Sequence, residues 1–191
     1  MRLIVMTFIT LLVAAITGFG STWLALREQP PTGAVQLGQW RAWPSTGGPA
    51  IDPYARAIIQ RSGALQLGTG EGVELVADLD SEGRPLSGDC VYDMTGPTPE
   101  ARIWTLTATA TGGKASGEPP SSLTSEGLLR GPGGALAIAI AAAPEPGAWL
   151  RVPAGEPFRL TLRLYDSPTG FTTRPHVADQ LTPVIRRRSC S

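Results

Sequence analysis

Residues 158–165 read FRLTLRLY and alternate at every step between two kinds of side chain. On one side of an extended chain lie Phe158, Leu160, Leu162 and Leu164, and on the other lie Arg159, Thr161, Arg163 and Tyr165. A period of two with large apolar groups on one face is typical of a half-buried β-strand. This stretch predicts a sheet with one face in a core and one face outside.

The same period recurs in four other stretches. On one face they group Val73, Leu75, Ala77 and Leu79; Cys90, Tyr92 and Met94; Trp104, Leu106 and Ala108; and Leu136, Ile138 and Ile140. The Pro- and Gly-rich connections between them are too short for helical crossovers, so we expect mostly antiparallel pairing. The sequence predicts a mainly β fold, an antiparallel β-sandwich or jelly-roll-like domain.

One short helix is predicted in DPYARAIIQRSG, residues 52–63. Asp52 is the expected N-cap, and Pro53 takes the first helical position, where its missing N–H costs nothing. Tyr54, Ile58 and Arg61 share one side, and Gly63 can end the helix.

The N-terminus carries the longest apolar run. No charged residue occurs from Leu3 to Leu26, and Arg2 and Arg27 flank the run. About 20 apolar residues span a bilayer as a helix, and we expect residues 1–27 to be a single transmembrane anchor. The alternative is a signal peptide cut near Gly18–Gly20. Residues 28–34 are the expected linker, and residues 35–191 the folded domain.

Charge and cysteine content restrict the compartment and the partners. The formal net charge is +0, which argues against nucleic acid as a partner. Cys90 and Cys190 are the two cysteines, and in an oxidising compartment we expect them to form a disulfide. The alternative is two unrelated thiols.

Several stretches together resemble a known bacterial family. They are Asp52-Pro-Tyr-Ala-Arg-Ala, DSEGRPLSGDCVY, IWTLTATA and AWLRVPAGEPFRLTLRLYDSP. Over residues 50–187 the chain is similar to the domain of unknown function 1214. The resemblance implies a jelly-roll-like fold and a frequent companion, the domain of unknown function 1254, but no established activity.

DLDSEG, residues 78–83, places acids at alternate positions, as calcium loops do. It lies between two predicted strands and lacks flanking helices, so we interpret it as a turn. His176, with Asp179 three residues later, has no recognisable nucleophile for a catalytic triad. No catalytic, cofactor or metal residues are therefore assigned.

Aromatic residues supply the remaining candidates. Trp40, Trp43, Trp149 and Tyr165 are assigned to a ligand or partner surface, although core packing is the commoner role of tryptophan. Arg186–Arg188 are either a solvated basic tail or a contact with anionic headgroups. Carboxylates available for glycan hydrolysis are Glu71, Glu74, Asp78, Asp93 and Asp166.

These observations lead to one main hypothesis. The protein is a single-pass protein of the bacterial inner membrane whose β domain faces the periplasm and acts by binding or assembly with a companion-domain protein. The alternatives are a hydrolase-like enzyme that acts on envelope glycan or lipid through carboxylates, and a sugar-binding module.

Overall fold

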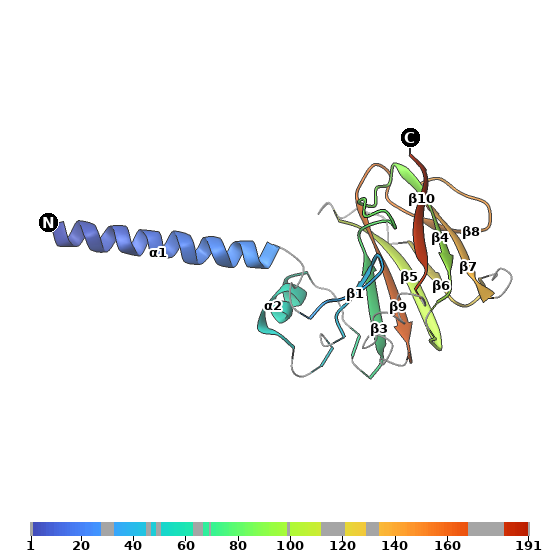
Figure 1. Cartoon of the computed structure of the whole chain (residues 1–191), viewed down its shortest axis with the longest axis horizontal. Helices are drawn as coiled ribbons and strands as arrows, with labels where there is room; N and C mark the ends of the chain where they lie inside the picture. Colours follow the sequence, from blue (N-terminus) through green and yellow to red (C-terminus); the bar gives the residue numbers. More distant parts are fainter. Residues whose placement is uncertain are drawn as a thin grey trace.

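The computed structural model describes residues 2–27, 33–44, 47–48, 51–62, 67–68, 70–98, 100–111, 121–128, 134–167 and 182–190. It is mainly β, with a short helix and a long apolar N-terminal helix (Figure 1). The helices are α1 (Arg2–Arg27) and α2 (Pro53–Ser62). The strands are β1 (Val35–Leu37), β2 (Trp40–Ala42), β3 (Gly72–Ala77), β4 (Cys90–Gly96), β5 (Ile103–Ala110), β6 (Ser121–Thr124), β7 (Leu136–Ala141), β8 (Ala148–Arg151), β9 (Phe158–Tyr165) and β10 (Val184–Cys190).

The strands form two sheets. One has six strands in the order β1-β2-β3-β9-β5-β6, and the other has four in the order β10-β4-β7-β8. The predicted antiparallel pairing is confirmed for every pair except β7 with β8, which run parallel. No helical crossover is needed there, because β8 is only four residues long and residues 142–147 return the chain as a loop. The jelly-roll detail stays a prediction.

The core lies between the two sheets. The four predicted inward residues of β9 are buried, and so are the residues that the sequence groups on one face of β4, β5 and β7 and Val73, Leu75 and Ala77 of β3. Tyr92 and Phe158, from opposite sheets, meet edge to face with ring centroids 5.9 Å apart. Leu79 was predicted to share the face of Val73, Leu75 and Ala77, which is buried, but it is 41% exposed. The reason is that β3 ends at Ala77 and the chain then turns.

α2 begins as the sequence predicts. Ala55 N donates to Asp52 Oδ1 at 3.2 Å, and Arg56 N donates to Asp52 O at 2.9 Å, so Asp52 is the N-cap. Of the described side chains in this helix, Ala55 is buried and Ile59 is half-buried, whereas Arg56, Ala57 and Gln60 are exposed. The helix therefore turns Ala55 and Ile59 towards the protein.

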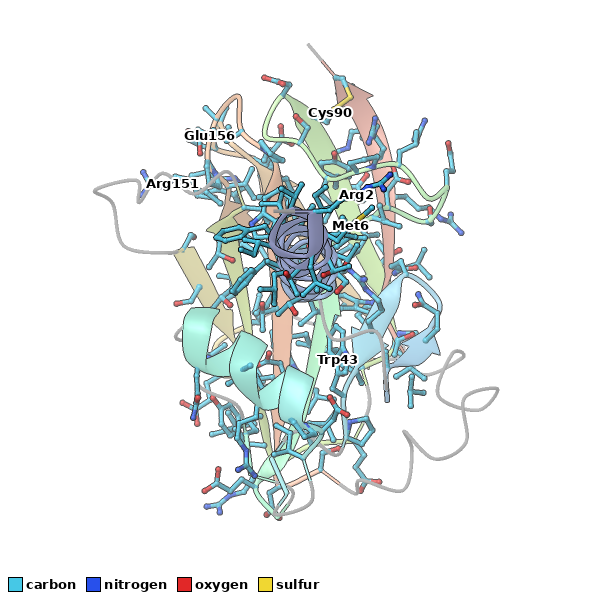
Figure 2. The ribbon with its side chains drawn as sticks, turned by 90° about the vertical axis from the view of Figure 1, so that its left-hand side faces the viewer. Arg2, Met6, Trp43, Cys90, Arg151 and Glu156 are labelled. Atoms are coloured by element: carbon cyan, nitrogen blue, oxygen red, sulfur yellow. A yellow bond between two sulfur atoms is a disulfide. The ribbon has the colours of Figure 1, made fainter. Side chains whose placement is uncertain are left out.

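α1 stands apart from the core. Its segment Arg2–Leu24 is long and apolar enough to cross a membrane, and none of it is buried. Phe8 and Phe19 are 71% and 80% exposed. The helix could anchor the protein in a membrane, and a signal sequence would have the same properties. In Figure 2, which looks along α1, the six-stranded sheet lies behind α1 and α2, so its outer face is on the side of the N-terminal helix.

Candidate functional site

The outer face of the six-stranded sheet carries a row of paired charges. Asp78 follows β3 and contacts two arginines: Arg159 Nε donates to Asp78 Oδ1 at 2.6 Å, and Arg41 Nη2 donates to Asp78 Oδ2. Next to this group, Arg163 Nε donates to Glu74 Oε2 at 2.8 Å across β9 and β3. Three arginines and two carboxylates therefore share this face, and all five side chains are partly accessible to solvent.

Two aromatic side chains border these ion pairs. The Arg41 guanidinium lies over the Trp43 ring, with 5.9 Å from its central carbon to the ring centroid. Tyr165 occupies an outward position of β9, two residues beyond Arg163, and is half-buried. Partly exposed aromatics beside arginines have the composition of protein-binding surfaces. Trp43 and Tyr165 are the two residues of the predicted aromatic surface that border this face.

The other two predicted surface residues lie elsewhere. Trp40 is fully buried, and its Nε1 donates to Pro183 O at 2.7 Å. It is a core residue and is not available at the surface. Trp149 lies in β8 of the four-stranded sheet, where it is half-buried and its Nε1 donates to Ala141 O at 3.0 Å. The four residues therefore do not form one site.

The stretch DLDSEG forms a turn built around Asp80. The carboxylate is buried, and its Oδ1 accepts from the backbone N–H groups of Glu82 and Arg84, both at 2.9 Å. Asp80 N donates to Arg84 O at 2.8 Å. Gly83 has a φ of 77°, a conformation that favours glycine. Asp80 thus acts as the internal acceptor of a tight turn.

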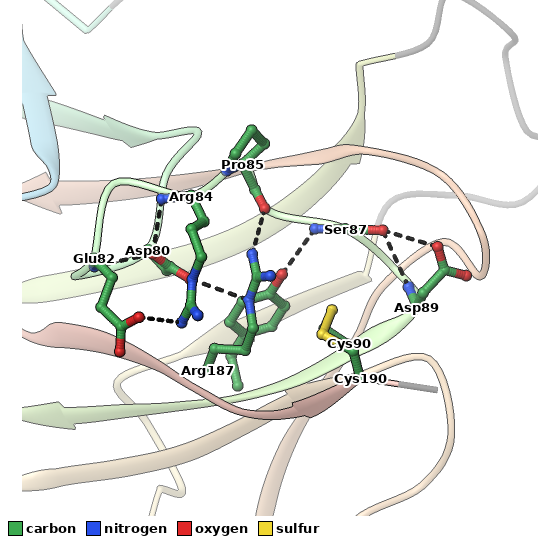
Figure 3. Close-up of a disulfide and its surroundings, with 10 residues drawn as sticks. Asp80, Glu82, Arg84, Pro85, Ser87, Asp89, Cys90, Arg187 and Cys190 are labelled. Atoms are coloured by element: carbon green, nitrogen blue, oxygen red, sulfur yellow. Dashed lines mark hydrogen bonds and ion pairs between the residues drawn. A yellow bond between two sulfur atoms is a disulfide. The ribbon is translucent and has the colours of Figure 1, made fainter.

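Asp80 also joins this turn to the last strand (Figure 3). Its Oδ2 accepts from Arg84 Nε at 3.0 Å and lies 3.1 Å from Arg187 Nε, an ion pair without hydrogen-bond geometry. Arg187 also donates from Nη2 to Pro85 O at 2.8 Å and lies over the Tyr92 ring, 5.5 Å from its centroid. The two arginines neutralise a carboxylate that would be costly to bury alone.

The predicted disulfide closes the same region. The structure joins Cys90 of β4 to Cys190 of β10, which are 100 residues apart. The two cysteines are cross-strand partners. Asp80, Arg84, Arg187 and this disulfide are called the C-terminal clamp below. The clamp fixes β10, an edge strand, to the rest of the domain.

The charge of Asp80 is set by two opposing effects. Burial would raise the pKa of the carboxyl, but hydrogen bonds from Arg84 and Glu82 and the positive charge of Arg84 outweigh it. The net result is a pKa below the usual 3.8. The carboxylate is therefore charged at neutral pH and stays paired with the arginines.

Two of the three arginines in the C-terminal run have acidic partners. Arg188 donates to Asp93 and, at 2.8 Å, to Glu145 Oε2, and these contacts raise the pKa of its guanidinium. Arg187 belongs to the clamp, and Arg186 is exposed. β10 also lies on the side of the sandwich away from α1 (Figure 1). The location of the three arginines, and the pairing of Arg187 and Arg188 with carboxylates, favour a structural role over a membrane contact.

In the described part of the chain, the carboxylates that were candidates for glycan hydrolysis are not arranged as a catalytic pair. Glu74, Asp78 and Asp93 each have an arginine partner. Glu71 and Asp166 are both exposed, and their backbones are joined by a hydrogen bond in which Asp166 N donates to Glu71 O at 2.8 Å. Among the residues described, no three or more His, Cys, Asp or Glu residues are grouped to hold a metal ion. His176 and Asp179 lie outside the described residues.

Sequence reasoning missed the contact between Asp80 and Arg187. The two residues lie at distant positions in the chain, and local patterns do not report such pairs. One signal was present: Arg187 follows buried Ile185 by two positions, on the inward side of a strand. A charged residue at an inward position requires a buried partner of opposite charge.

The fold and its N-terminal helix define the class of the molecule: a two-sheet β domain preceded by a helix that could span a membrane. The model of one family, described as protein of unknown function (DUF1214), matches residues 71–169. The chain belongs to this family, as the sequence predicted.

Two solved structures are similar to this chain. The VPA0106 protein from Vibrio parahaemolyticus has 21% sequence identity and a TM-score of 0.53, over 73% of this chain and 36% of that one. An uncharacterised protein from Burkholderia cenocepacia has 16% identity and a TM-score of 0.41, over 62% of this chain and 39% of that one. The chain therefore spans well under half the length of either protein. No curated protein matches it.

Proposed function

We propose that the protein is a single-pass module of the bacterial inner membrane whose β domain lies in the periplasm and acts by binding or assembly. The observation that carries the proposal is the apolar surface of α1. Its segment Arg2–Leu24 is long and apolar enough to cross a membrane, and none of it is buried. Such a large apolar surface requires a lipid or protein environment.

The orientation follows from charge and redox chemistry. Arg2 precedes the apolar run, and Arg27 after it is followed by Glu28. Because Arg2 and the amino terminus lie together on one side of the apolar run, we place that side in the cytoplasm by the positive-inside rule. The paired cysteines support this orientation, because disulfides persist in oxidising compartments such as the periplasm.

The proposed partner is a companion-domain protein supplied by another chain. Two observations support the proposal: the family resemblance, which implies a companion domain, and VPA0106, in which the matched fold accounts for 36% of the chain. In that protein the fold lies beside a large further portion of chain. We propose the outer face of the six-stranded sheet as the docking surface, because Trp43, Tyr165 and three arginines gather there.

The test is purification of the affinity-tagged full-length protein in mild detergent, with identification of what co-purifies in stoichiometric amount. A companion-domain protein should be present with the wild type and reduced with Trp43→Ala and Tyr165→Ala. Trp149→Ala is the matched control on the other sheet and should retain it. A wild-type protein that purifies without a partner would contradict the assembly role. Equal loss of the partner in all three variants would contradict the outer face of the six-stranded sheet as the docking surface.

The hydrolase hypothesis has less support from the geometry. Glu74, Asp78 and Asp93 are each engaged in an ion pair with an arginine, and the described residues do not group two of these carboxylates around a common cleft. The sugar-binding hypothesis has less support as well. Trp40 is buried and cannot contact a sugar, and Trp43 and Trp149 lie on different sheets, so they do not form one site.

A further inference from the structure

The chain between the membrane anchor and the β domain is short. α1 ends at Arg27 and β1 begins at Val35, so residues 28–34 separate them. Each residue of an extended chain spans at most about 3.6 Å, so this linker reaches roughly 25 Å at most. If α1 spans the bilayer, one side of the β domain must stay within that distance of the lipid headgroups.

α2 is the element that occupies this position. It contacts α1 and lies beside the C-terminal end of that helix, where the apolar run stops (Figure 1). The end-on view places α2 on the α1 side of the six-stranded sheet (Figure 2). α2 therefore lies on the side of the domain that faces the membrane.

The charge of α2 suits an anionic lipid surface. The helix PYARAIIQRS contains two arginines, Arg56 and Arg61, and no acidic residue. Arg56 is exposed, and no ion pair involves it among the described residues. By contrast, Arg187 and Arg188 on the far side of the domain are already paired with carboxylates.

We propose that α2 rests on the bilayer surface and that Arg56 binds the headgroups of anionic phospholipids. The inference rests on the proposed membrane anchor. A basic residue near an anionic bilayer contributes about 1 kcal/mol, a factor of roughly five in occupancy, and salt screens the effect within a Debye length. The contact would hold the domain in one orientation on the membrane.

The test is amide hydrogen exchange of the full-length protein in nanodiscs. One set contains only phosphatidylcholine, and the other also contains anionic phosphatidylglycerol. Residues 53–62 should exchange more slowly with phosphatidylglycerol, and salt at about 1 M, where the Debye length is about 3 Å, should remove the difference. Arg56→Gln should reduce the lipid-dependent protection roughly fivefold. Arg186→Gln, an exposed arginine on β10, is the matched control and should leave it unchanged.

Two outcomes would overturn the proposal. One is equal exchange of residues 53–62 in both lipids, and the other is an equal effect of Arg56→Gln and Arg186→Gln. Exchange of α1 in the same samples separates this failure from failure of the anchor. A protected α1 with an unresponsive α2 contradicts only the lipid contact, whereas a rapidly exchanging α1 contradicts the anchor as well.

Discussion

Asp78 and Asp80 are two residues apart, and each contacts two arginines, yet their surroundings differ. The Asp78 side chain is 23% exposed on the outer face of the six-stranded sheet, where Arg41 and Arg159 approach it from neighbouring strands. The Asp80 side chain is 0% exposed and receives two backbone N–H groups as well as its arginines. Aspartate and arginine therefore form a surface network around Asp78 and a buried clamp around Asp80.

This difference separates binding from stability. A charge pair at the surface stays close to water and contributes little to folding, so it is available for recognition. A buried carboxylate that loses its partners is costly, because the remaining groups stay desolvated. We therefore expect substitutions at Asp80 to affect folding and substitutions around Asp78 to affect partner binding.

The largest effect is expected for Asp80→Ala. The substitution leaves Arg187 partly buried, at 19% exposure, and removes the acceptor of the turn. Breaking a buried ion pair by removing one partner costs about 3–5 kcal/mol in the free energy of unfolding. Denaturant unfolding of the full-length protein in detergent measures the change. A loss below about 1 kcal/mol, as at an exposed pair, would show that the clamp is not a stabilising unit.

The next effect is expected for Cys90→Ser with Cys190→Ser. The disulfide closes a loop of 100 residues, and removal of such a link destabilises a domain by about 2–4 kcal/mol. β10 is an edge strand, so its C-terminal end should show the fastest new amide exchange. The matched control is the wild-type protein with reductant, which should behave as the double variant does. An unchanged unfolding midpoint in both samples would contradict a structural role for the link.

A smaller effect is expected on acidification. The pKa of Asp80 in the folded protein lies below its usual 3.8, so the unfolded chain binds the proton at a higher pH than the folded chain does. The contribution of Asp80 is therefore complete above about pH 4 and is lost as pH falls through the folded pKa. The unfolding midpoint of the wild type should fall more steeply below pH 4 than that of Asp80→Asn. Parallel curves for the two proteins would contradict this linkage.

The smallest effect on stability is expected for Glu74→Gln, which breaks the ion pair with Arg163 on the outer face. Because both side chains remain partly exposed, we expect a loss of less than about 1 kcal/mol. The amount of co-purified partner should fall clearly, while the free energy of unfolding changes little. A large loss of stability with unchanged partner binding would reverse the roles assigned to the two aspartate environments.

Most of the strands could be predicted from the sequence, because the alternation of apolar and polar residues is visible within each strand. Phe158, Leu160, Leu162 and Leu164 are all buried, as their alternation required. The N-cap at Asp52 was also predictable, because the residue types of a helix start are local. The parallel pairing of β7 with β8 was not, since nothing in a four-residue strand specifies its direction.

The candidate site was less predictable, because residue type does not determine burial. Trp40 and Trp43 occupy one short stretch, yet Trp40 is fully buried and Trp43 remains partly exposed. The period-two pattern of β2 explains the difference, since Trp40 and Ala42 point inward and Arg41 points outward. Pairing of Asp80 with Arg187 required the tertiary fold and could not be assigned from local patterns.

The most direct test of the central claim is the intact mass of the full-length protein, extracted from membranes and alkylated without reductant. A membrane-anchored module with a periplasmic domain predicts a chain that keeps residues 2–27 and carries no alkyl group on Cys90 or Cys190. A chain shortened near Gly18–Gly20 would show that the apolar helix is a cleaved signal. Two alkylated cysteines would place the domain in a reducing compartment and contradict the proposed orientation.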